Sequence, residues 1–218
     1  LAIKGSFGMS QKGKSLRYAL IGLQFVISIA FIICAIFLKK QHSYMMNYDM
    51  GFNKECLLTA NIPVSSMDER DAFSSELLNN PNIKEVAWSQ DRMVAEMHMT
   101  WGRWHHGEQM MLTVMPVSWN FLQVMGIEVF EGRDFLPSDE KGDGAIILNE
   151  YAKNKYNLNL EEVIEWNGTP FPATGFCRDF HFKPLHEESD AFAFYIYDSE
   201  VLTKYFPTPH LTLRTIEN

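Results

Sequence analysis

The chain has 218 residues and a formal net charge of −8. This acidic balance argues against binding to nucleic acid and against docking on an anionic lipid surface, because both carry negative charge. Outside one apolar run and its flanks about 165 residues remain, which is enough for one domain with its own hydrophobic core or for two small lobes.

The longest apolar segment runs from Ala19 to Leu38 and contains no charged residue. A helix of this length spans about 30 Å, the thickness of the hydrocarbon core of a bilayer, so the segment predicts a transmembrane helix. A secretory signal peptide would have a shorter apolar region, of about 7 to 15 residues. Gln24 and Ser28 lie one turn apart on one face, which indicates contact with other helices; the alternative is that Gln24 reaches the aqueous interface.

Basic residues before the span outnumber those that follow it directly. The residues before it are Lys4, Lys12, Lys14 and Arg17, and those after it are Lys39 and Lys40. The positive-inside rule therefore predicts a cytoplasmic N-terminus and an extracytoplasmic remainder. We expect a cytoplasmic segment (1–18), a transmembrane helix (19–38), a stem helix (39–54) that stops at Gly51, and a periplasmic core domain (55–218).

The remaining residues alternate between strand-like and helix-like patterns, which predicts an α+β domain. Ser66 heads a capping box with Glu69, so a helix at 66–78 is expected between strands at 56–64 and 83–90, as one β-α-β unit. Ser118 is expected to cap a short helix that Gly126 ends. A further helix is expected at 150–156, and further strands at 111–117, 127–130, 145–148, 162–166, 173–179, 191–197 and 210–215.

Met, Trp and His residues concentrate between residues 91 and 111 without clear periodicity. We expect an irregular or β-hairpin excursion here. Its residues Trp101, Trp104, His105 and His106 form either an adaptable surface for a partner or part of a core hairpin. A metal or haem site is disfavoured, because adjacent histidines project in different directions and no Cys or carboxylate lies at a typical ligand spacing.

The sequence offers little support for catalysis. Asp179 and His181 are a candidate catalytic pair, because residues two apart on a strand face the same side. No Ser or Cys stands in a nucleophile context such as G-x-S-x-G, and no Walker-type sequence is present. We therefore expect no enzymatic activity and no cofactor. Cys56 and Cys177 leave two interpretations open, a disulfide in an oxidising compartment or two free thiols.

Five segments, in this order, resemble the MacB-like and FtsX-like ABC transporter permeases. They are residues 16–55, 79–89 (NNPNIKEVAWS), 121–135 (FLQVMGIEVFEGRDF), 145–156 (AIILNEYAKNKY) and 174–188 (TGFCRDFHFKPLHEE). The most specific pieces are Gly132, Arg133, Asp134 and Phe135, then Asn149 and Glu150, then Asp179, Phe180, His181 and Phe182. We interpret these motif residues as structural: Gly132 in a turn, Arg133 and Asp134 paired or capping locally, and the two phenylalanines packed from one face of a strand.

The resemblance implies a transmembrane helix followed by a periplasmic domain with porter-like β-α-β units and a mainly β, sabre-like subdomain. It implies an inner-membrane location, a cytoplasmic ABC ATPase as partner, contact with membrane lipid, a dimer of permease halves or of identical chains, and a periplasmic adaptor or substrate protein. The implied function is mechanotransmission, in which the stem couples ATP hydrolysis to export. Such permeases have further spans, so we expect a fragment of a longer protein. The alternative is a single-span sensor or interaction ectodomain, which would need a folded cytoplasmic output that residues 1–18 cannot supply.

Overall fold

The computed structural model describes residues 11–64, 66–95, 98–105, 108–141, 144–160, 163–166, 169–183, 187, 190–196 and 209–216. The chain divides into two compact units, Leu1–Tyr48 and Asp49–Asn218.

In the described part of the first unit, residues 11–48, the chain forms the helix α1, from Gln11 to Met46. Its stretch Gly13–Met46 has a mean hydropathy of 2.7 in its most apolar window and is long and apolar enough to cross a membrane. The predicted span lies inside it. The stem helix expected at 39–54 is wrong beyond Met46, because the chain turns there. The Asn47 amide donates to the Ser43 carbonyl at 2.9 Å, and the Asp49 carboxylate accepts from the Gly51 N–H at 2.9 Å.

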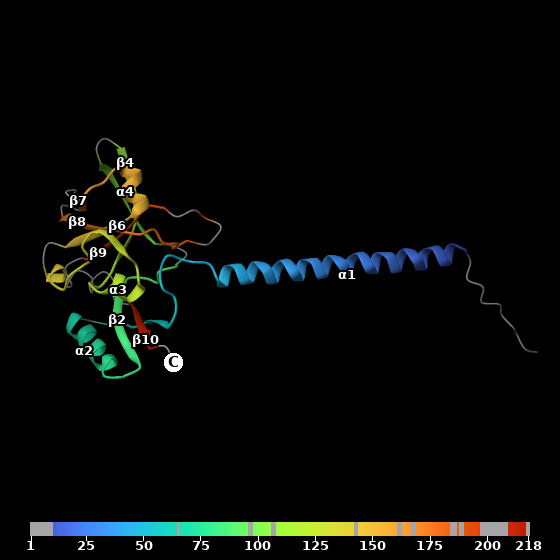
Figure 1. The fold of residues 1–218 in the computed structure, drawn as a ribbon, viewed down its shortest axis with the longest axis horizontal. Coiled ribbons are helices and arrows are strands. Elements are labelled where there is room, and N and C mark those ends of the chain that lie inside the picture. Colours follow the sequence, from blue (N-terminus) through green and yellow to red (C-terminus); the bar gives the residue numbers. More distant parts are fainter. Residues whose placement is uncertain are drawn as a thin grey trace, which may run out of the picture. The chain divides into compact units, whose positions relative to one another are not determined.

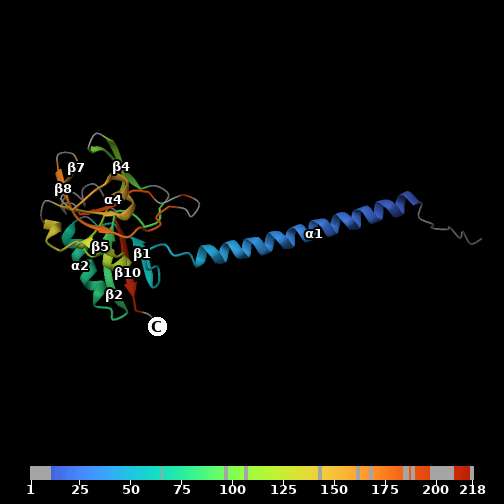
Figure 2. The same cartoon turned by 45° about the horizontal axis from the view of Figure 1, so that its top comes forward.

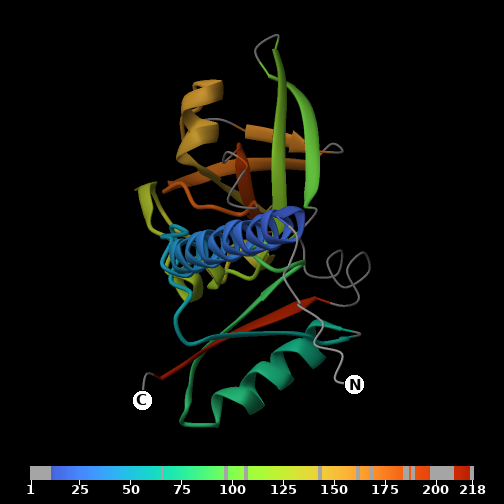
Figure 3. The same ribbon diagram turned by 90° about the vertical axis from the view of Figure 1, so that its right-hand side faces the viewer.

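The second unit contains a small three-stranded sheet with the strand order β1-β10-β2. Strand β1 is Leu57–Asn61, β2 is Ile83–Ser89 and β10 is His210–Thr215. Both β1 and β2 run antiparallel to β10. The helix α2 (Met67–Leu78) connects β1 to β2 and lies along this sheet (Figure 3). The expected β-α-β unit is therefore split, since the last strand of the domain inserts between its two strands.

The large sheet is mixed and has the order β3-β4-β9-β6-β8-β5, with β7 paired to β8. Its strands are β3 (Met99–His105), β4 (Glu108–Pro116), β5 (Val129–Gly132), β6 (Ala145–Asn149), β7 (Val163–Trp166), β8 (Thr169–Cys177) and β9 (Phe192–Ile196). Pairs β4–β9 and β6–β8 are parallel. The helices are α3 (Phe121–Met125) and α4 (Glu150–Tyr156), with a short 3-10 turn at Asp139–Lys141. The predicted α+β class is confirmed.

Two hydrophobic clusters cover the two faces of the large sheet. Phe192 and Phe194 of β9 pack on the face that α3 covers, whereas Ala193 and Tyr195 pack on the face that α4 covers. Figure 1 shows the two helices on opposite sides of β6 and β9. Burial on both faces explains why these two strands are continuous apolar runs in the sequence. A third cluster lies between the small sheet and α2.

The region rich in Met, Trp and His forms the antiparallel hairpin β3–β4. Trp101 is 2% exposed and packs against Tyr195 and Phe171, with ring centroids 4.6 and 5.7 Å apart. The assignment of Trp101 to a partner surface is therefore wrong, because its indole belongs to the core. The side chains of Trp104 and His105, and all of His106, lie outside the described residues.

The capping predictions have mixed outcomes. The Ser66 hydroxyl accepts from the Glu69 N–H at 3.2 Å and caps α2, as expected. Gly126 ends α3 with φ +69°, also as expected. Ser118 is not the cap of α3, which begins after Asn120; its hydroxyl accepts instead from the Trp88 N–H at 2.9 Å.

Candidate functional site

The neck segment, residues 49–56, is the first part of the domain unit and follows α1 in the chain. Three backbone hydrogen bonds fix it. The Met50 carbonyl accepts from His181 at 2.7 Å, the Asn53 N–H donates to the Met125 carbonyl at 2.9 Å, and the Cys56 carbonyl accepts from Thr215 at 2.9 Å. The neck segment is thus tied to three separate parts of the domain: the loop after β8, the end of α3, and β10.

Arg214 of β10 adds a side-chain anchor to the neck segment. Its Nε donates to the Val124 carbonyl at 2.9 Å, its Nη1 to the Glu55 carbonyl at 3.1 Å and its Nη2 to the Asn53 carbonyl at 3.1 Å. A guanidinium presents several donors in one rigid plane, which suits three fixed carbonyl oxygens. One side chain therefore joins the small sheet, α3 and the neck segment.

Arg214 is not among the residues that the sequence patterns predicted to matter. Strand β10 reads HLTLRT, and Arg214 is its one residue of permanent charge. A lone arginine in an otherwise uncharged strand is the signal that points to specific acceptors, because a partly buried guanidinium carries five N–H donors that need partners. Its partners are backbone carbonyls of distant segments, which no local pattern marks.

Gly51 brings the neck segment directly onto the loop after β8. Its φ is +76°, and a Cβ at this position would stand 2.6 Å from the Asp179 carbonyl oxygen and 2.8 Å from the Phe180 Cα. Glycine is required here for two reasons, the left-handed conformation and the close approach. The motif at 179–182 is therefore the platform on which the neck segment lies.

The two phenylalanines of this motif anchor the platform in the core. Phe180 and Phe182 are buried, and their ring centroids lie 5.1 and 4.6 Å from that of Phe192. Strand β8 ends at Cys177, so the expected strand through Asp179 and the packing of both rings from a strand face are wrong. Both rings nevertheless reach the same cluster, because the loop turns them toward β9.

Asp179 and Asn149 organise the start of α4. The Asp179 carboxylate accepts from the Tyr151 N–H at 2.8 Å, and the fully buried Asn149 side chain accepts from Ala152 at 3.1 Å and from Phe192 at 2.9 Å. Burial raises the pKa of Asp179; the Tyr151 N–H opposes this shift and the nearby Glu150 adds to it. These contacts are those of a helix cap.

The Gly132–Phe135 motif forms a tight turn against β8. Gly132 has φ +77°, and a Cβ there would collide with the Thr174 carbonyl oxygen. Arg133 pairs with Asp139 through two hydrogen bonds of 2.7 and 2.9 Å and also donates to the Asp134 carbonyl at 3.0 Å. Of the two alternatives expected for Arg133 and Asp134, pairing or local capping, the capping one is therefore observed for Asp134. The Asp134 carboxylate caps the Phe135 N–H at 2.7 Å, and burial raises its pKa. This motif therefore has a structural role.

The cysteines and the possible metal ligands of the described residues give no sign of a reactive centre. Cys34, Cys56 and Cys177 are free thiols, so the disulfide interpretation is not the one observed. Burial raises the pKa of the Cys177 thiol, which makes it a poor nucleophile. Among the residues that the structure describes, no group of three His, Cys, Asp or Glu side chains could hold a metal ion.

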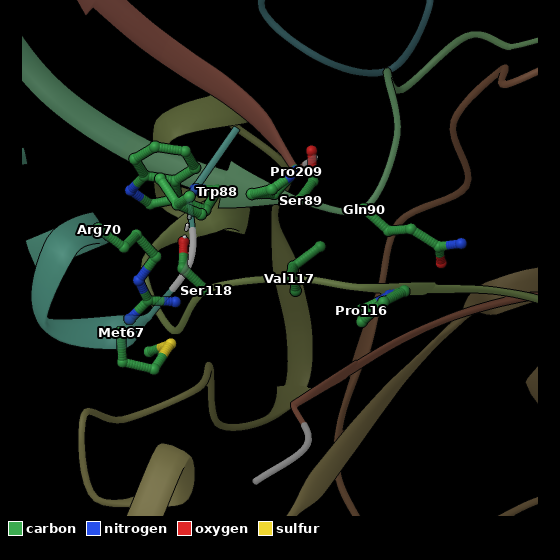
Figure 4. A pocket seen from close by; sticks show the side chains of 10 residues that line it. Met67, Arg70, Trp88, Ser89, Gln90, Pro116, Val117, Ser118 and Pro209 are labelled. Carbon is green, nitrogen blue, oxygen red and sulfur yellow. Dashed lines mark hydrogen bonds between the residues drawn. The ribbon is translucent and has the colours of Figure 1, made fainter. Parts of the chain in front are cut away.

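A small cavity of about 40 Å³ lies where the ends of β2 and β4 meet (Figure 4). Its lining includes Val64, Arg70, Trp88 and Val117. The Arg70 guanidinium is nearly buried and lies 3.4 Å from a carboxylate oxygen of Glu140. Pockets for drug-sized ligands are larger, about 300 to 1,000 Å³, so this cavity does not indicate a substrate site.

No family model and no curated protein matches the chain. Its structure is similar to the crystal structure of the periplasmic region of MacB from Actinobacillus actinomycetemcomitans, with 14% identity, a TM-score of 0.53, and coverage of 77% of this chain and 78% of that one. The crystal structure of the extracellular domain of the noncanonic ABC-type transporter YknZ from Gram-positive bacteria is 19% identical, with a TM-score of 0.45 and coverage of 73% of this chain and 84% of that one. The chain therefore has the fold of the MacB periplasmic region, as the motif resemblance implied, and one apolar helix precedes this domain.

Proposed function

We propose that this chain is the membrane and periplasmic part of an ABC transporter permease. In this proposal residues 19–38 of α1 span the inner membrane with a cytoplasmic N-terminus, and residues 39–218 lie in the periplasm. A cytoplasmic ATPase moves the membrane helices, and the domain passes this motion to a periplasmic adaptor or substrate protein for export. The observation that carries the proposal is the MacB-type fold directly after a helix long enough to cross a bilayer.

The neck segment supports a mechanical role. Motion of α1 along the chain reaches the domain at Asp49, and the next seven residues are held by backbone bonds and by Arg214. The neck segment is hydrogen-bonded to β10 in the small sheet, to α3, and to the loop that follows β8 of the large sheet. A displacement of the neck segment would therefore be transmitted to both sheets. A loosely attached linker would absorb such a displacement instead of transmitting it.

We further propose that the domain itself is not an enzyme. The Asp179 carboxylate accepts from the Tyr151 N–H at the start of α4, a contact that gives this side chain a structural role. The backbone N–H of His181 donates to the Met50 carbonyl, which ties the loop that carries both residues to the neck segment. Replacing either residue with Ala is expected to perturb folding or coupling. Hydrolase turnover that disappears on either substitution would overturn the non-enzyme proposal.

The first test is purification of the native gene product from membranes. The product is tagged and extracted in mild detergent, and mass spectrometry determines its mass and the proteins that co-purify. We expect an ATPase in the complex and a product larger than the 25.2 kDa of this chain, in line with the further spans that the resemblance implies. A 25.2 kDa product without an ATPase would refute the permease proposal and favour the single-span sensor. An unrelated tagged single-span protein, extracted in parallel, controls for adventitious capture.

A further inference from the structure

Strand β1 is an edge strand that the proposed export function does not use. Among the strands that the structure describes, it pairs with β10 alone, which leaves its other edge open (Figure 2). Four of its five residues are exposed, and Leu58 is 60% exposed. An open strand edge presents unpaired backbone N–H and C=O groups to any strand that can reach it.

Natural edge strands usually carry features that prevent pairing, such as Lys, Pro or a bulge. Strand β1 has the sequence LLTAN, with no charge and no proline. Its register with β10 is continuous from Leu57 opposite Arg214 to Asn61 opposite His210, without a bulge. Pro63 lies beyond the strand and would limit a new ladder to about these five residues. In a chain of net charge −8 this neutral edge is suited to pairing.

The side chains of β1 are complementary to a second copy of the same strand. In an antiparallel pair centred on Thr59, each Leu58 stands opposite an Ala60, and Thr59 stands opposite its own copy. In the small sheet Leu58 is opposite Leu213, which is opposite Val86, and Ala60 is opposite Leu211, which is opposite Trp88. The pairing would therefore join two apolar rows into one that crosses both sheets, in the order Val86, Leu213, Leu58, Ala60, Leu211, Trp88.

We propose that β1 pairs antiparallel with β1 of a second copy and joins the two small sheets into one six-stranded sheet. A two-fold axis at Thr59 makes the contact isologous. Five residues per chain form an interface well below the standard size of about 1,600 Å², so the pairing is weak between free molecules. The proposed membrane span in α1 would hold two copies in the same membrane. Their effective concentration is then high enough for a weak β1–β1 pair to form in a measurable fraction of the molecules.

Cysteine cross-linking in membranes that contain the full chain tests this register. Opposite residues of an antiparallel pair have Cα atoms about 4.5 to 5.5 Å apart, within the range of a disulfide. In a background with Cys34→Ala and Cys56→Ser, Thr59→Cys is expected to form dimers on mild oxidation. The matched control is Glu76→Cys, an exposed position on α2. We expect at least about tenfold more dimer from Thr59→Cys, because only a held geometry forms the bond efficiently.

Two further variants distinguish a fixed register from random collision. Leu58→Cys or Ala60→Cys alone is expected to give little dimer, whereas membranes that contain both variants give the mixed dimer. Adding Leu58→Lys to Thr59→Cys is expected to lower the yield about tenfold, since each dimer loses its two Leu58–Ala60 contacts and gains two positive charges. Leu78→Lys, at an exposed leucine of α2, should leave the yield unchanged.

Equal yields from Thr59→Cys and Glu76→Cys would overturn the proposal, provided that a small maleimide labels both thiols. Equal yields from single cysteines at 58, 59 and 60 would overturn it as well, because they indicate collision without register. Neither result bears on ATPase co-purification, so failure of this inference is distinguishable from failure of the permease proposal.

Discussion

Replacing Arg214 with Ala tests whether this side chain anchors the neck segment. The variant removes the donors to the carbonyls of Val124, Glu55 and Asn53. A buried hydrogen bond to a charged group contributes about 1.5 to 3 kcal/mol. Arg214 is only partly buried and borders an open hollow lined by Asn53 and Gln123, where water can replace part of each bond. At about 1 kcal/mol per acceptor, the free energy of unfolding should fall by about 3 kcal/mol.

The measurement is urea unfolding of the full chain in mild detergent, followed by tryptophan fluorescence. All five tryptophans lie after residue 48, so the signal reports on the domain. The matched control is Arg178→Ala, which removes a 52% exposed side chain and its surface ion pairs to Glu150 and Glu128, and should cost less than about 1 kcal/mol. Arg214→Lys should fall between the two, because one ammonium cannot serve three coplanar acceptors. Losses for Arg214→Ala and Arg178→Ala that agree within about 0.5 kcal/mol would refute the anchoring argument.

Three further predictions concern the neck segment, pH and the stem. Gly51→Ala should lower the free energy of unfolding by about 2 to 4 kcal/mol, because a left-handed φ and a Cβ 2.6 Å from the Asp179 carbonyl oxygen are both unfavourable. The control is Gly22→Ala, since open space surrounds Gly22. Equal stability of the two variants would contradict the prediction. Burial lowers the pKa of His98 below its ordinary 6.5, so on acidification the unfolded chain binds this proton before the folded chain does. The free energy of unfolding should therefore fall as the pH drops from 7 through 6.5, and it should fall less in His98→Leu; identical pH profiles of the two proteins would contradict this prediction. Gly-Pro at residues 43 and 44, inside α1, should uncouple ATP hydrolysis from export, because proline breaks the helix, whereas Ala-Ala at the same positions should preserve coupling. Unchanged export in the Gly-Pro variant would contradict the proposal that the stem transmits the motion.

Local patterns were sufficient for the elements whose cause is local. The apolar run from Ala19 to Leu38 predicts a helix, because its length matches a bilayer and its composition excludes charge. Ser66 and Gly126 set helix ends through bonds and conformations within one turn of themselves. The short helix that begins at Glu150 follows from Asn149, whose side chain caps it. The motif residues at 132–135 and 179–182 were also found, although the partners of Arg133 and the loop that carries Phe180 were not.

The tertiary structure alone decided the features that depend on contacts between distant segments. Strand β10 lies between β1 and β2. Local sequence could not predict this order, because a strand carries no local mark of its neighbour and its pairing depends on which faces the whole core must bury. For the same reason Trp101 is a core residue, since its burial is determined by β8 and β9 far along the chain. The neck segment depends on Gly51, which meets the Asp179 carbonyl, and on Arg214, whose acceptors are backbone atoms. Backbone carbonyls are present at every residue, so the sequence does not mark which of them Arg214 will bind. The sequence by itself determines the helix that leads to the neck segment, whereas only the folded structure determines how the domain holds the neck segment.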